Sequence, residues 1–566
     1  MSEPLLAVAA ALPLAIAGAL LVGALWPATK AMPVAWVTAA LVAATVWQLP
    51  VRWIAAATTW GVLLAIEILW IVFGALVLLY TLKQAGAIAR ITEGFATISN
   101  DHRVQTVLVG FFLTTFLTGV AGFGTPAAIV APLLVALGFP ALAAVVVALL
   151  GHAIATTFGA VGVPIQPGVT DAVESVDGVS ASEAAVFAAD VSGVIAAYHL
   201  LPGLLMPLVT VSMLVYFFGD VSDRSIAAVR PVVPLAVFAG AAFIIPFAVT
   251  ATFVGPELPS IIAPMVGGGV TAAVLKRGLL LPEDEWRLPE ANEWPETWTN
   301  ATDVKQSAGS GAGSGVITDG GAPISLARAW VPYLLLVVLL VGTRDFTPIG
   351  TVLTDVEVLA PTWTGIFATS ITNSVRWAYA PGTWLIVTAL ATIPLYGLSR
   401  AEVKQAWREA GETTAGPAVA LVCIIGTVGI LLHSGQFPGA PGNKSMMLAL
   451  ADGVGGALDG MYTVVVAPIG VVGTFVTGSV MVSNVTFTAM QYELAGDIGL
   501  DRTHVVAAQA AAGAMGNAIS IHNVIAALAT VGLVGKEGVV IRINLLPVVA
   551  YTLVIILLLS ATSVLA

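Results

Sequence analysis

Two apolar stretches of the sequence are interrupted by small and polar residues whose backbone groups could bind a solute. The first interruption runs from Thr118 to Pro126 (TGVAGFGTP), and the second runs from Thr477 to Asn484 (TGSVMVSN). Lipid cannot hydrogen-bond the backbone groups that such breaks expose, so the breaks must face protein or a water-filled cavity. Interrupted segments in corresponding positions of two halves are the best sequence indication of a secondary transporter's binding site. The pair of breaks therefore predicts a transporter.

The breaks offer groups that suit a small anionic organic substrate. A helix that begins near Thr125 and Pro126 presents unpaired N–H groups and the positive end of its dipole, which can bind a carboxylate. Serine and asparagine side chains at the second break and at a later interruption add hydrogen-bonding groups. The predicted substrate-binding residues are Gly122, Phe123, Gly124, Thr125, Pro126, Ser479, Ser483, Asn484, Asn517 and Ser520. Packing of helices through small residues is the alternative explanation for any one of them.

Ionisable residues inside apolar segments form a second set of candidates, because a charge at the centre of a membrane helix costs about 2.5–3.5 kcal/mol. The candidates are Glu67, His152, Asp190, His199, Arg376, His433 and His522. Histidine exchanges protons near neutral pH, and two of the histidines lie at interruptions. We expect His152, His522 and Glu67 to carry a coupled proton, with a hydrogen-bonded packing role, the more common one for a lone histidine, as the alternative. Arg376 could pair with a substrate carboxylate, although an arginine that snorkels to the membrane surface is the simpler explanation.

The composition is that of an integral membrane protein. Hydrophobic residues make up 58% of the chain and charged residues only 9%, against roughly 25% charged residues in ordinary soluble domains. Apolar stretches long enough to cross a membrane as helices recur from Pro4 to the C-terminus. Runs that are apolar on all sides, such as Leu142 to Leu150, do not fit a membrane β-barrel. We expect an all-α polytopic membrane protein with about 12–14 transmembrane helices or half-crossings, some interrupted or re-entrant.

A polar segment near the middle divides the chain into two membrane halves. We expect an N-terminal half at 1–275, a hydrophilic loop at 276–327 and a C-terminal half at 328–566. The loop is acidic and includes the flexible Gly/Ser sequence SAGSGAGSG at 307–315. Because the loop lacks the apolar content of a separate domain, we interpret it as a connection between the halves.

Each half contains a break followed by a second interruption, which predicts an internal repeat at about 83–170 and about 444–535. Basic residues are enriched in cytoplasmic loops. Lys83 and Arg103 precede the break of the first copy, whereas Lys536 follows that of the second. The charges therefore predict that the copies run in opposite directions, as in an inverted-topology repeat that builds one midplane site. Chance spacing of glycine and proline in membrane helices is the alternative.

Charge and cysteine content exclude several other classes of protein. The net charge is −11, which argues against nucleic-acid binding. The single cysteine, Cys423, excludes an intrachain disulfide and a cysteine-rich metal site. Acidic, lysine-poor loops fit a prokaryotic host that lives in high salt, with a simple acidic linker as the alternative. No HExxH or GxSxG motif occurs, so we expect no cofactor, no metal and no enzymatic activity.

Several motifs occur along the chain in an order that is typical of one family of membrane carriers. They are GVAGFGTPAA at 119–128, LLVALGF at 133–139, FGAVGVPI at 158–165, GPELP at 255–259, RAWVP at 328–332, TGS and SN within 477–484, and VGLVGKE at 531–537. On these motifs the chain resembles the L-lactate permease family. The family pattern also has an aspartate directly after Thr-Gly-Ser, where this chain has Val480, and a lysine where Asn517 stands.

The resemblance implies a proton-coupled, multi-pass importer of L-lactate and related 2-hydroxy acids such as glycolate in the cell membrane. We expect alternating access, with a small carboxylate, a proton and the lipid bilayer as partners; a homo-oligomer is left open. An inside-negative potential opposes anion uptake by about 2.3 kcal/mol per charge at 100 mV, which favours coupling to a cation. Sodium coupling through carbonyls at the breaks is the first alternative. A membrane-embedded enzyme that acts on lipid or prenyl chains is the second.

Overall fold

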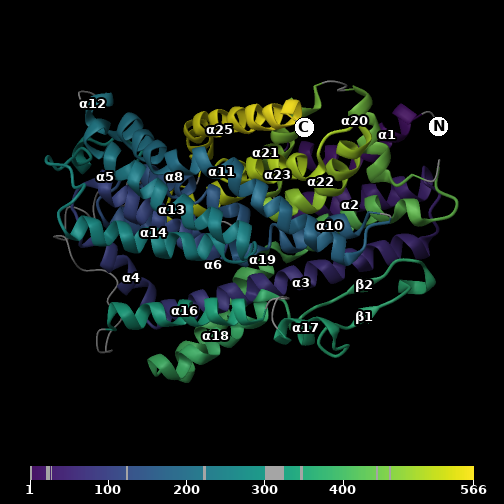
Figure 1. Ribbon diagram of the computed structural model, residues 1–566, viewed down its shortest axis with the longest axis horizontal. Helices are drawn as coiled ribbons and strands as arrows, with labels where there is room; N and C mark the ends of the chain where they lie inside the picture. Colours follow the sequence, from purple (N-terminus) through teal and green to yellow (C-terminus); the bar gives the residue numbers. More distant parts are fainter. Residues whose placement is uncertain are drawn as a thin grey trace.

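The computed structural model is almost entirely helical. It describes residues 3–20, 24, 26, 28–122, 125–176, 178–220, 225–299, 324–343, 348–441, 444–457, 461–533 and 535–565. Phe123, Gly124 and the Gly/Ser-rich part of the central loop therefore lie outside the described residues. Among the described residues, the strands are limited to one antiparallel pair, β1 (Thr362–Trp363) and β2 (Asn373–Ser374). The polytopic all-α fold predicted from the sequence is confirmed (Figure 1).

The helices divide at the central loop into two series. The first series is α1 (Glu3–Gly18), α2 (Ala28–Thr45), α3 (Val51–Gln84), α4 (Ala87–Ala96), α5 (His102–Gln105), α6 (Thr114–Val120), α7 (Thr125–Ala136), α8 (Ala141–Gly151), α9 (Gly159–Gly162), α10 (Ala172–Glu174), α11 (Ala181–Phe218), α12 (Ile226–Val229), α13 (Val233–Phe253) and α14 (Pro259–Lys276). The second series is α16 (Leu326–Gly342), α17 (Pro348–Asp355), α18 (Pro381–Tyr396), α19 (Arg400–His433), α20 (Met446–Ala457), α21 (Tyr462–Thr477), α22 (Val480–Asp497), α23 (Arg502–Gly516), α24 (Ile521–Thr530) and α25 (Glu537–Leu565). Short π or 3-10 segments are η2 (Thr106–Leu113), η3 (Ile154–Phe158), η4 (Gln166–Asp171), η5 (Arg230–Val232), η6 (Ala291–Glu293), η7 (Ile366–Ala368) and η8 (Ser434–Gln436).

Many of these helices are long and apolar enough to cross a membrane. In the described part of the chain, eight spans meet this condition: Val51–Gln84, His102–Val120, Ala181–Phe218, Ile226–Phe253, Pro259–Lys276, Ala418–Gln436, Arg502–Thr530 and Glu537–Val564. A ninth would be the pair Ala141–Gly151 and Ile154–Gly162, which bends by 49° at its break. Shorter apolar helices such as α7 and α21 accompany them. The chain is therefore a multi-pass membrane protein with interrupted helices.

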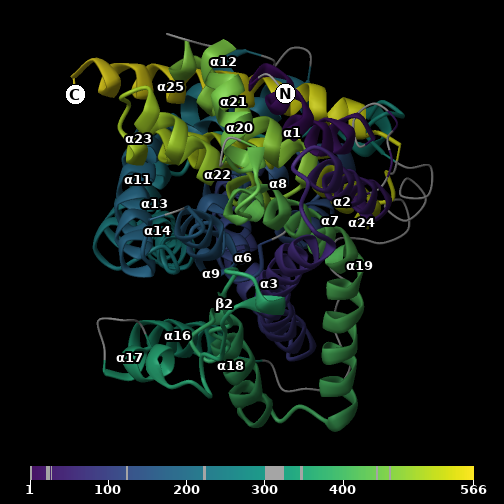
Figure 2. The same ribbon diagram turned by 90° about the vertical axis from the view of Figure 1, so that its right-hand side faces the viewer.

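Two groups of helices can be distinguished. The α3–α19 group consists of α2, α3, α16, α18 and α19, which pack on one another. The hairpin group consists of α5–α11, α13, α14 and α21–α25. Figure 2 shows α16 and α18 on the far side of α3 from the hairpin group. Backbones approach closely within the α3–α19 group, since a Cβ on Gly61 would lie 2.6 Å from the carbonyl oxygen of Ile425.

The first predicted break is the tip of a helical hairpin. The chain runs from His102 through η2 to Val120, turns, and returns along α7. At the base, the His102 Nε2 lies 3.3 Å from the carbonyl oxygen of Leu137, just beyond α7. At the tip, Gly122 has a φ of +59°, and a Cβ there would lie 2.8 Å from Ala160 Cβ. The tip of this first hairpin therefore rests on the interruption that follows α8.

The second predicted break has the same form. Helices α21 and α22 are antiparallel, because the Tyr462 hydroxyl at the start of α21 donates to the Gln491 side chain near the end of α22. Gly478, at the tip, has a φ of +78°, and a Cβ there would lie 3.0 Å from His522 Cβ. The tip of this second hairpin therefore rests on the interruption between α23 and α24.

The bases of the two hairpins lie at opposite ends of α11 (Figure 1). Near the start of α11, Phe187 contacts Tyr492 of α22 with ring centroids 5.0 Å apart. At the end of α11, Phe218 contacts Trp298 at 5.1 Å, and the Trp298 carbonyl oxygen accepts a hydrogen bond from the N–H of Leu142 in α8. Opposed hairpins are what an inverted-topology repeat requires, but the repeat itself stays a prediction.

Part of the central loop is docked at the base of the first hairpin. Arg103 and Asp101 form a buried ion pair of 2.6 Å, with side chains 3% and 2% exposed. The N–H of Trp286 donates to Asp101 Oδ2 at 3.0 Å, and the N–H of Leu288 donates to His102 Nδ1 at 2.9 Å. This docked segment, 284–298, is thus packed against the first half of the chain rather than extended in solvent.

Gly240 allows α13 to approach α11 closely. A Cβ on Gly240 would lie 1.9 Å from the carbonyl oxygen of Leu204. We expect Gly240→Ala to force the helices apart and to lower the free energy of unfolding by about 1–3 kcal/mol. Gly269→Ala in α14 is the matched control, because nothing lies within 4 Å of its Cβ position. Thermal unfolding of both variants in one detergent tests this; equal melting temperatures would contradict the prediction.

Candidate functional site

The interruptions of the two halves meet in the interior of the hairpin group. The Thr156 hydroxyl donates to the carbonyl oxygen of Ala514 at 3.2 Å. The Asn484 amide of α22 donates to the carbonyl oxygen of Pro164 at 2.8 Å. Helix α24, which follows the later interruption, packs on α7, which follows the first break. We call this region the break junction, and it brings together predicted residues from both halves.

At the second break, most of the predicted side chains already have protein partners. Ser479 caps α22 by accepting a hydrogen bond from the N–H of Val482 at 3.4 Å. The buried Ser483 hydroxyl donates to the carbonyl oxygen of Gly470 at 3.3 Å. Asn517 is buried, and its side-chain oxygen accepts a hydrogen bond from the Asn523 amide. These contacts fix the shape of the break and leave few of its side chains free.

Several buried polar atoms at the break junction have no hydrogen-bond partner among the described residues. They are His152 Nε2, Thr474 Oγ1, Gln509 Oε1, Ser520 Oγ, Asn523 Oδ1 and Asn544 Oδ1. Buried polar atoms are nearly always hydrogen-bonded to protein or water, so each exception needs an explanation. Ser520 is fully buried, and its hydroxyl also makes no capping bond to α24. Such a cluster of free donors and acceptors is what a polar solute would need.

The remaining predicted residues occupy different surroundings. Thr125 begins α7, and the neighbouring Pro126 is buried. His152 is buried at the end of α8, where its Nδ1 lies 2.8 Å from the carbonyl oxygen of Ala148. His522 is exposed on the surface of α24. Glu67 does not lie at the junction but on α3, where it faces a cavity.

This cavity, which we call the acidic cavity, lies between the α3–α19 group and the hairpin group and has a volume of about 470 Å³. Small-molecule sites typically enclose roughly 300–1,000 Å³. Its polar and charged lining residues are Glu67, Gln166, Thr170, Asp171, Glu174, Ser175, Thr362, Ser370, Thr372, Asn373, Ser374, Arg376, Tyr379, His433 and Gln436. Val161 and Val163 of the first half's second interruption also line it. The cavity is thus adjacent to the break junction.

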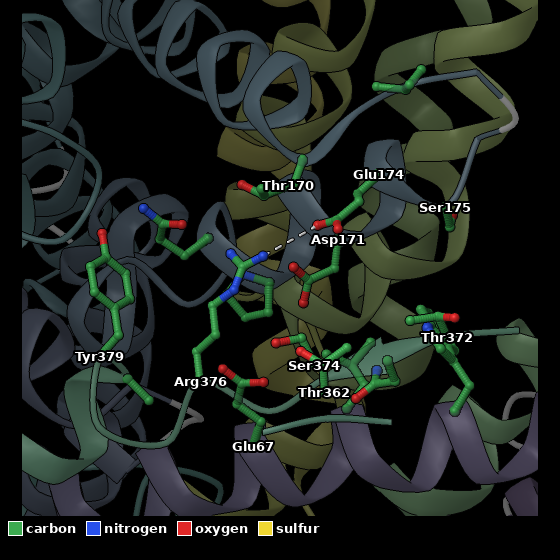
Figure 3. A pocket seen from close by; sticks show the side chains of 18 of the residues that line it. Glu67, Thr170, Asp171, Glu174, Ser175, Thr362, Thr372, Ser374, Arg376 and Tyr379 are labelled. Carbon is green, nitrogen blue, oxygen red and sulfur yellow. Dashed lines mark ion pairs between the residues drawn. The ribbon is translucent and has the colours of Figure 1, made fainter. Parts of the chain in front are cut away.

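Four charged side chains converge in the acidic cavity (Figure 3). Arg376 Nη2 lies 3.9 Å from Glu174 Oε2, with both side chains a little more than one-third exposed. Glu67 and Asp171 point into the same space. Burial raises the pKa of Asp171, the Glu67 carboxylate raises it further, and Arg376 acts in the opposite direction. The cluster therefore favours protonation of Asp171 at pH values where an ordinary aspartate is ionised.

His433 adds an uncharged group to this lining. Its side chain is 5% exposed, and neither ring nitrogen makes a well-formed hydrogen bond among the described residues, although the Gln436 side chain interacts with the ring. Its ring packs edge-on against Trp60, with centroids 4.8 Å apart. An imidazole with two free nitrogens can donate and accept one hydrogen bond each.

The sequence predictions reached only part of the acidic cavity. Glu67 was predicted as a proton carrier, and Arg376 was considered as a carboxylate partner. Asp171 and Glu174 were not among the predicted site residues, although they lie within ten residues of the interruption at 158–165. That proximity to an interruption was the available signal. Nothing in the sequence indicated that α3 and the β-strands would face them.

Comparison with known proteins gives a consistent result over the length of the chain. A family model described as L-lactate permease matches residues 6–566. A putative L-lactate permease of Haemophilus influenzae is 24% identical, with 86% of this chain and 84% of the relative aligned. The L-lactate permease of Escherichia coli K12 is 27% identical, over 85% and 82% of the two chains. The glycolate permease GlcA of the same strain is 28% identical, over 83% and 80%. With its interrupted helices and these matches, the chain belongs to the L-lactate permease family.

Proposed function

We propose that the protein imports L-lactate and related 2-hydroxy monocarboxylates with a proton, by alternating access, in the plasma membrane of a prokaryote. The names of the relatives, which include L-lactate and glycolate permeases, support transport of small hydroxy acids. The observation that carries the proposal is the cluster of buried polar atoms without partners at the break junction. A membrane protein gains little from such atoms unless a solute or water binds them.

The break junction suits a carboxylate with an adjacent hydroxyl. Helices α7 and α24 begin at the junction and pack on each other, and a helix N-terminus carries a positive dipole end that attracts an anion. The Ser520 hydroxyl can then donate a hydrogen bond to the substrate carboxylate, and Asn523 Oδ1 can accept one from the substrate hydroxyl. We propose that these groups bind the substrate, together with the other residues predicted at the breaks.

The opposed hairpins support alternating access. Each hairpin closes the break junction from its own end of α11, so that withdrawal of one tip at a time would expose the junction to one side of the membrane. Gly122 and Gly478 make the turns at the tips with positive φ angles that other residues rarely adopt. We propose that the tips act as the two gates.

Uptake by the purified protein in liposomes tests the function and the coupling ion. We expect external lactate to drive counterflow of labelled lactate, and a pH gradient that is acidic outside to increase uptake severalfold. A sodium gradient of the same size should have no effect. If only the sodium gradient drives uptake, proton coupling is wrong; if no small carboxylate gives counterflow, the transport function is wrong.

A further inference from the structure

The acidic cavity holds more negative than positive charge when all its groups are ionised. Among its described lining residues, Arg376 is the only lysine or arginine, whereas Glu67, Asp171 and Glu174 are all acids. Carboxylates that share a partly buried space disfavour one another's ionised forms. The surplus acids can reduce this repulsion by taking up protons. The cavity can therefore bind protons, which lowers its net negative charge.

Arg376 is incompletely paired. The 3.9 Å between its Nη2 and Glu174 Oε2 exceeds the 2.7–2.9 Å or so of a charge-assisted hydrogen bond, so the guanidinium keeps donors for a second carboxylate. Its backbone is held in place, because the N–H of Val375 donates to the carbonyl oxygen of Pro361 at 3.0 Å and the N–H of Ala380 donates to the carbonyl oxygen of Arg376 at 2.9 Å. An arginine with an anchored backbone and free guanidinium donors is a suitable partner for an anion.

A second observation points to a ligand in the same cavity. The buried His433 lines the cavity, and neither ring nitrogen makes a well-formed hydrogen bond among the described residues, which is unfavourable for a buried polar group. A hydroxyl or water on a bound solute could satisfy it. His433 and Arg376 come from α19 and from the segment after β2, and neither belongs to the break junction.

We propose, resting on the transport function above, that the acidic cavity is a second site for small monocarboxylates, where the substrate carboxylate replaces Glu174 on Arg376 once Glu67 and Asp171 are protonated. With both acids neutral, the charges of Arg376 and Glu174 cancel, and an incoming monocarboxylate restores one of the two negative charges that protonation removed. Anion binding is therefore accompanied by proton uptake. His433 binds the 2-hydroxyl group of the same substrate.

The charged groups that face Arg376 come from both helix groups. Glu67 lies on α3, and His433 ends α19 in the same group of helices, whereas Asp171 and Glu174 lie on η4 and α10 of the hairpin group. Protonation and substrate binding would thus change the attraction between the two groups of helices. The raised pKa of Asp171 gives the sign: its protonated fraction grows as pH falls, so lactate affinity increases toward acidic pH.

Lactate binding to the full-length protein in detergent, followed by calorimetry across a range of pH, tests the proposal. We expect the wild type to bind lactate more tightly as pH falls, with proton uptake that shows as a buffer-dependent heat. Glu67→Gln with Asp171→Asn should remove most of this pH dependence and raise affinity at mildly alkaline pH by about tenfold. The exposed Glu285→Gln is the control and should behave as the wild type.

Single substitutions keep the test informative if the double variant does not fold. Glu174→Gln should raise affinity at all pH values, because it frees Arg376, whereas Arg376→Gln should abolish the pH-dependent component and Arg376→Lys should restore part of it. Wild-type affinity at every pH in Glu174→Gln, or a wild-type pH dependence in Arg376→Gln, would overturn the proposal. Counterflow separates the transport function from the second-site proposal. Lactate counterflow by the wild type supports the transport function, whatever the variants bind.

Discussion

Replacing Asp101 with asparagine is expected to lower the free energy of unfolding by about 3–5 kcal/mol. Asp101 accepts hydrogen bonds from Arg103 Nε at 3.1 Å, from the Arg103 N–H at 2.8 Å and from the Trp286 N–H at 3.0 Å. Asparagine keeps the shape but removes the negative charge, which leaves the buried Arg103 guanidinium without a counter-ion, although it still donates to the carbonyl oxygens of Ala228 and Asp284. It also turns an amide N–H toward groups that are themselves donors.

The matched control is Glu285→Gln in the same docked segment. Glu285 pairs with Arg287 at 3.1 Å, but both side chains are more than half exposed. Pairs of this kind contribute about 0–1 kcal/mol, so stability should hardly change. Thermal unfolding in detergent compares the two variants, and hydrogen exchange at α5 reports whether the base of the first hairpin has opened. Similar melting temperatures for the two variants would show that the buried pair does not hold the docked segment.

Replacing Ser520 with alanine is expected to raise the KM for lactate about tenfold without loss of stability. Its hydroxyl is fully buried and makes no hydrogen bond to the described protein, so alanine removes no protein contact. If the substrate binds this hydroxyl, the substitution removes a hydrogen bond to a charged or polar solute, which contributes about 1.5–3 kcal/mol for a charged group. A purely structural serine without partners would tolerate alanine in both respects.

Ser192→Ala is the control for this substitution. Ser192 is equally buried, but its hydroxyl already donates to the carbonyl oxygen of Ala188 at 2.8 Å within α11. Uptake kinetics in liposomes should give a wild-type KM for this variant, and thermal unfolding should show a small loss of stability at most. An unchanged KM in Ser520→Ala would remove Ser520 from the proposed site.

The interrupted helices could be predicted because their signal is local. Gly122 and Gly478 adopt positive φ angles at the hairpin tips, and small polar residues surround them in the sequence. Such residues are unfavourable in a continuous membrane helix, so their positions alone mark the breaks. The charge pattern further suggested opposed copies, and the two hairpin bases do lie at opposite ends of α11.

The acidic cavity could not be predicted in the same way because its residues are distant in the sequence. Glu67, Asp171, Arg376 and His433 come from four separate elements, and only the packing of α3 and α19 against the hairpin group brings them together. Arg376 in particular has the sequence context of a surface arginine. No periodic pattern reports which faces of two long helices enclose a cavity.

The attachment of the docked segment could not be predicted from its composition. Residues 284–298 contain five acids and two prolines, a composition that favours a solvated linker. Yet Trp286 and Leu288 are each less than a tenth exposed, and Trp298 packs on Phe218. These apolar side chains, together with the backbone hydrogen bonds to Asp101 and His102, attach the segment to the first half.

The attachment of the docked segment affects when the first half can fold during translation. Domains commonly fold from the N-terminus as the chain leaves the ribosome. The base of the first hairpin, however, needs the Trp286 backbone to complete the partners of Asp101, and α8 needs the Trp298 carbonyl. The first half can therefore reach its final packing only after nearly three hundred residues have been made, when the ribosome is already translating the segment that leads into the second half.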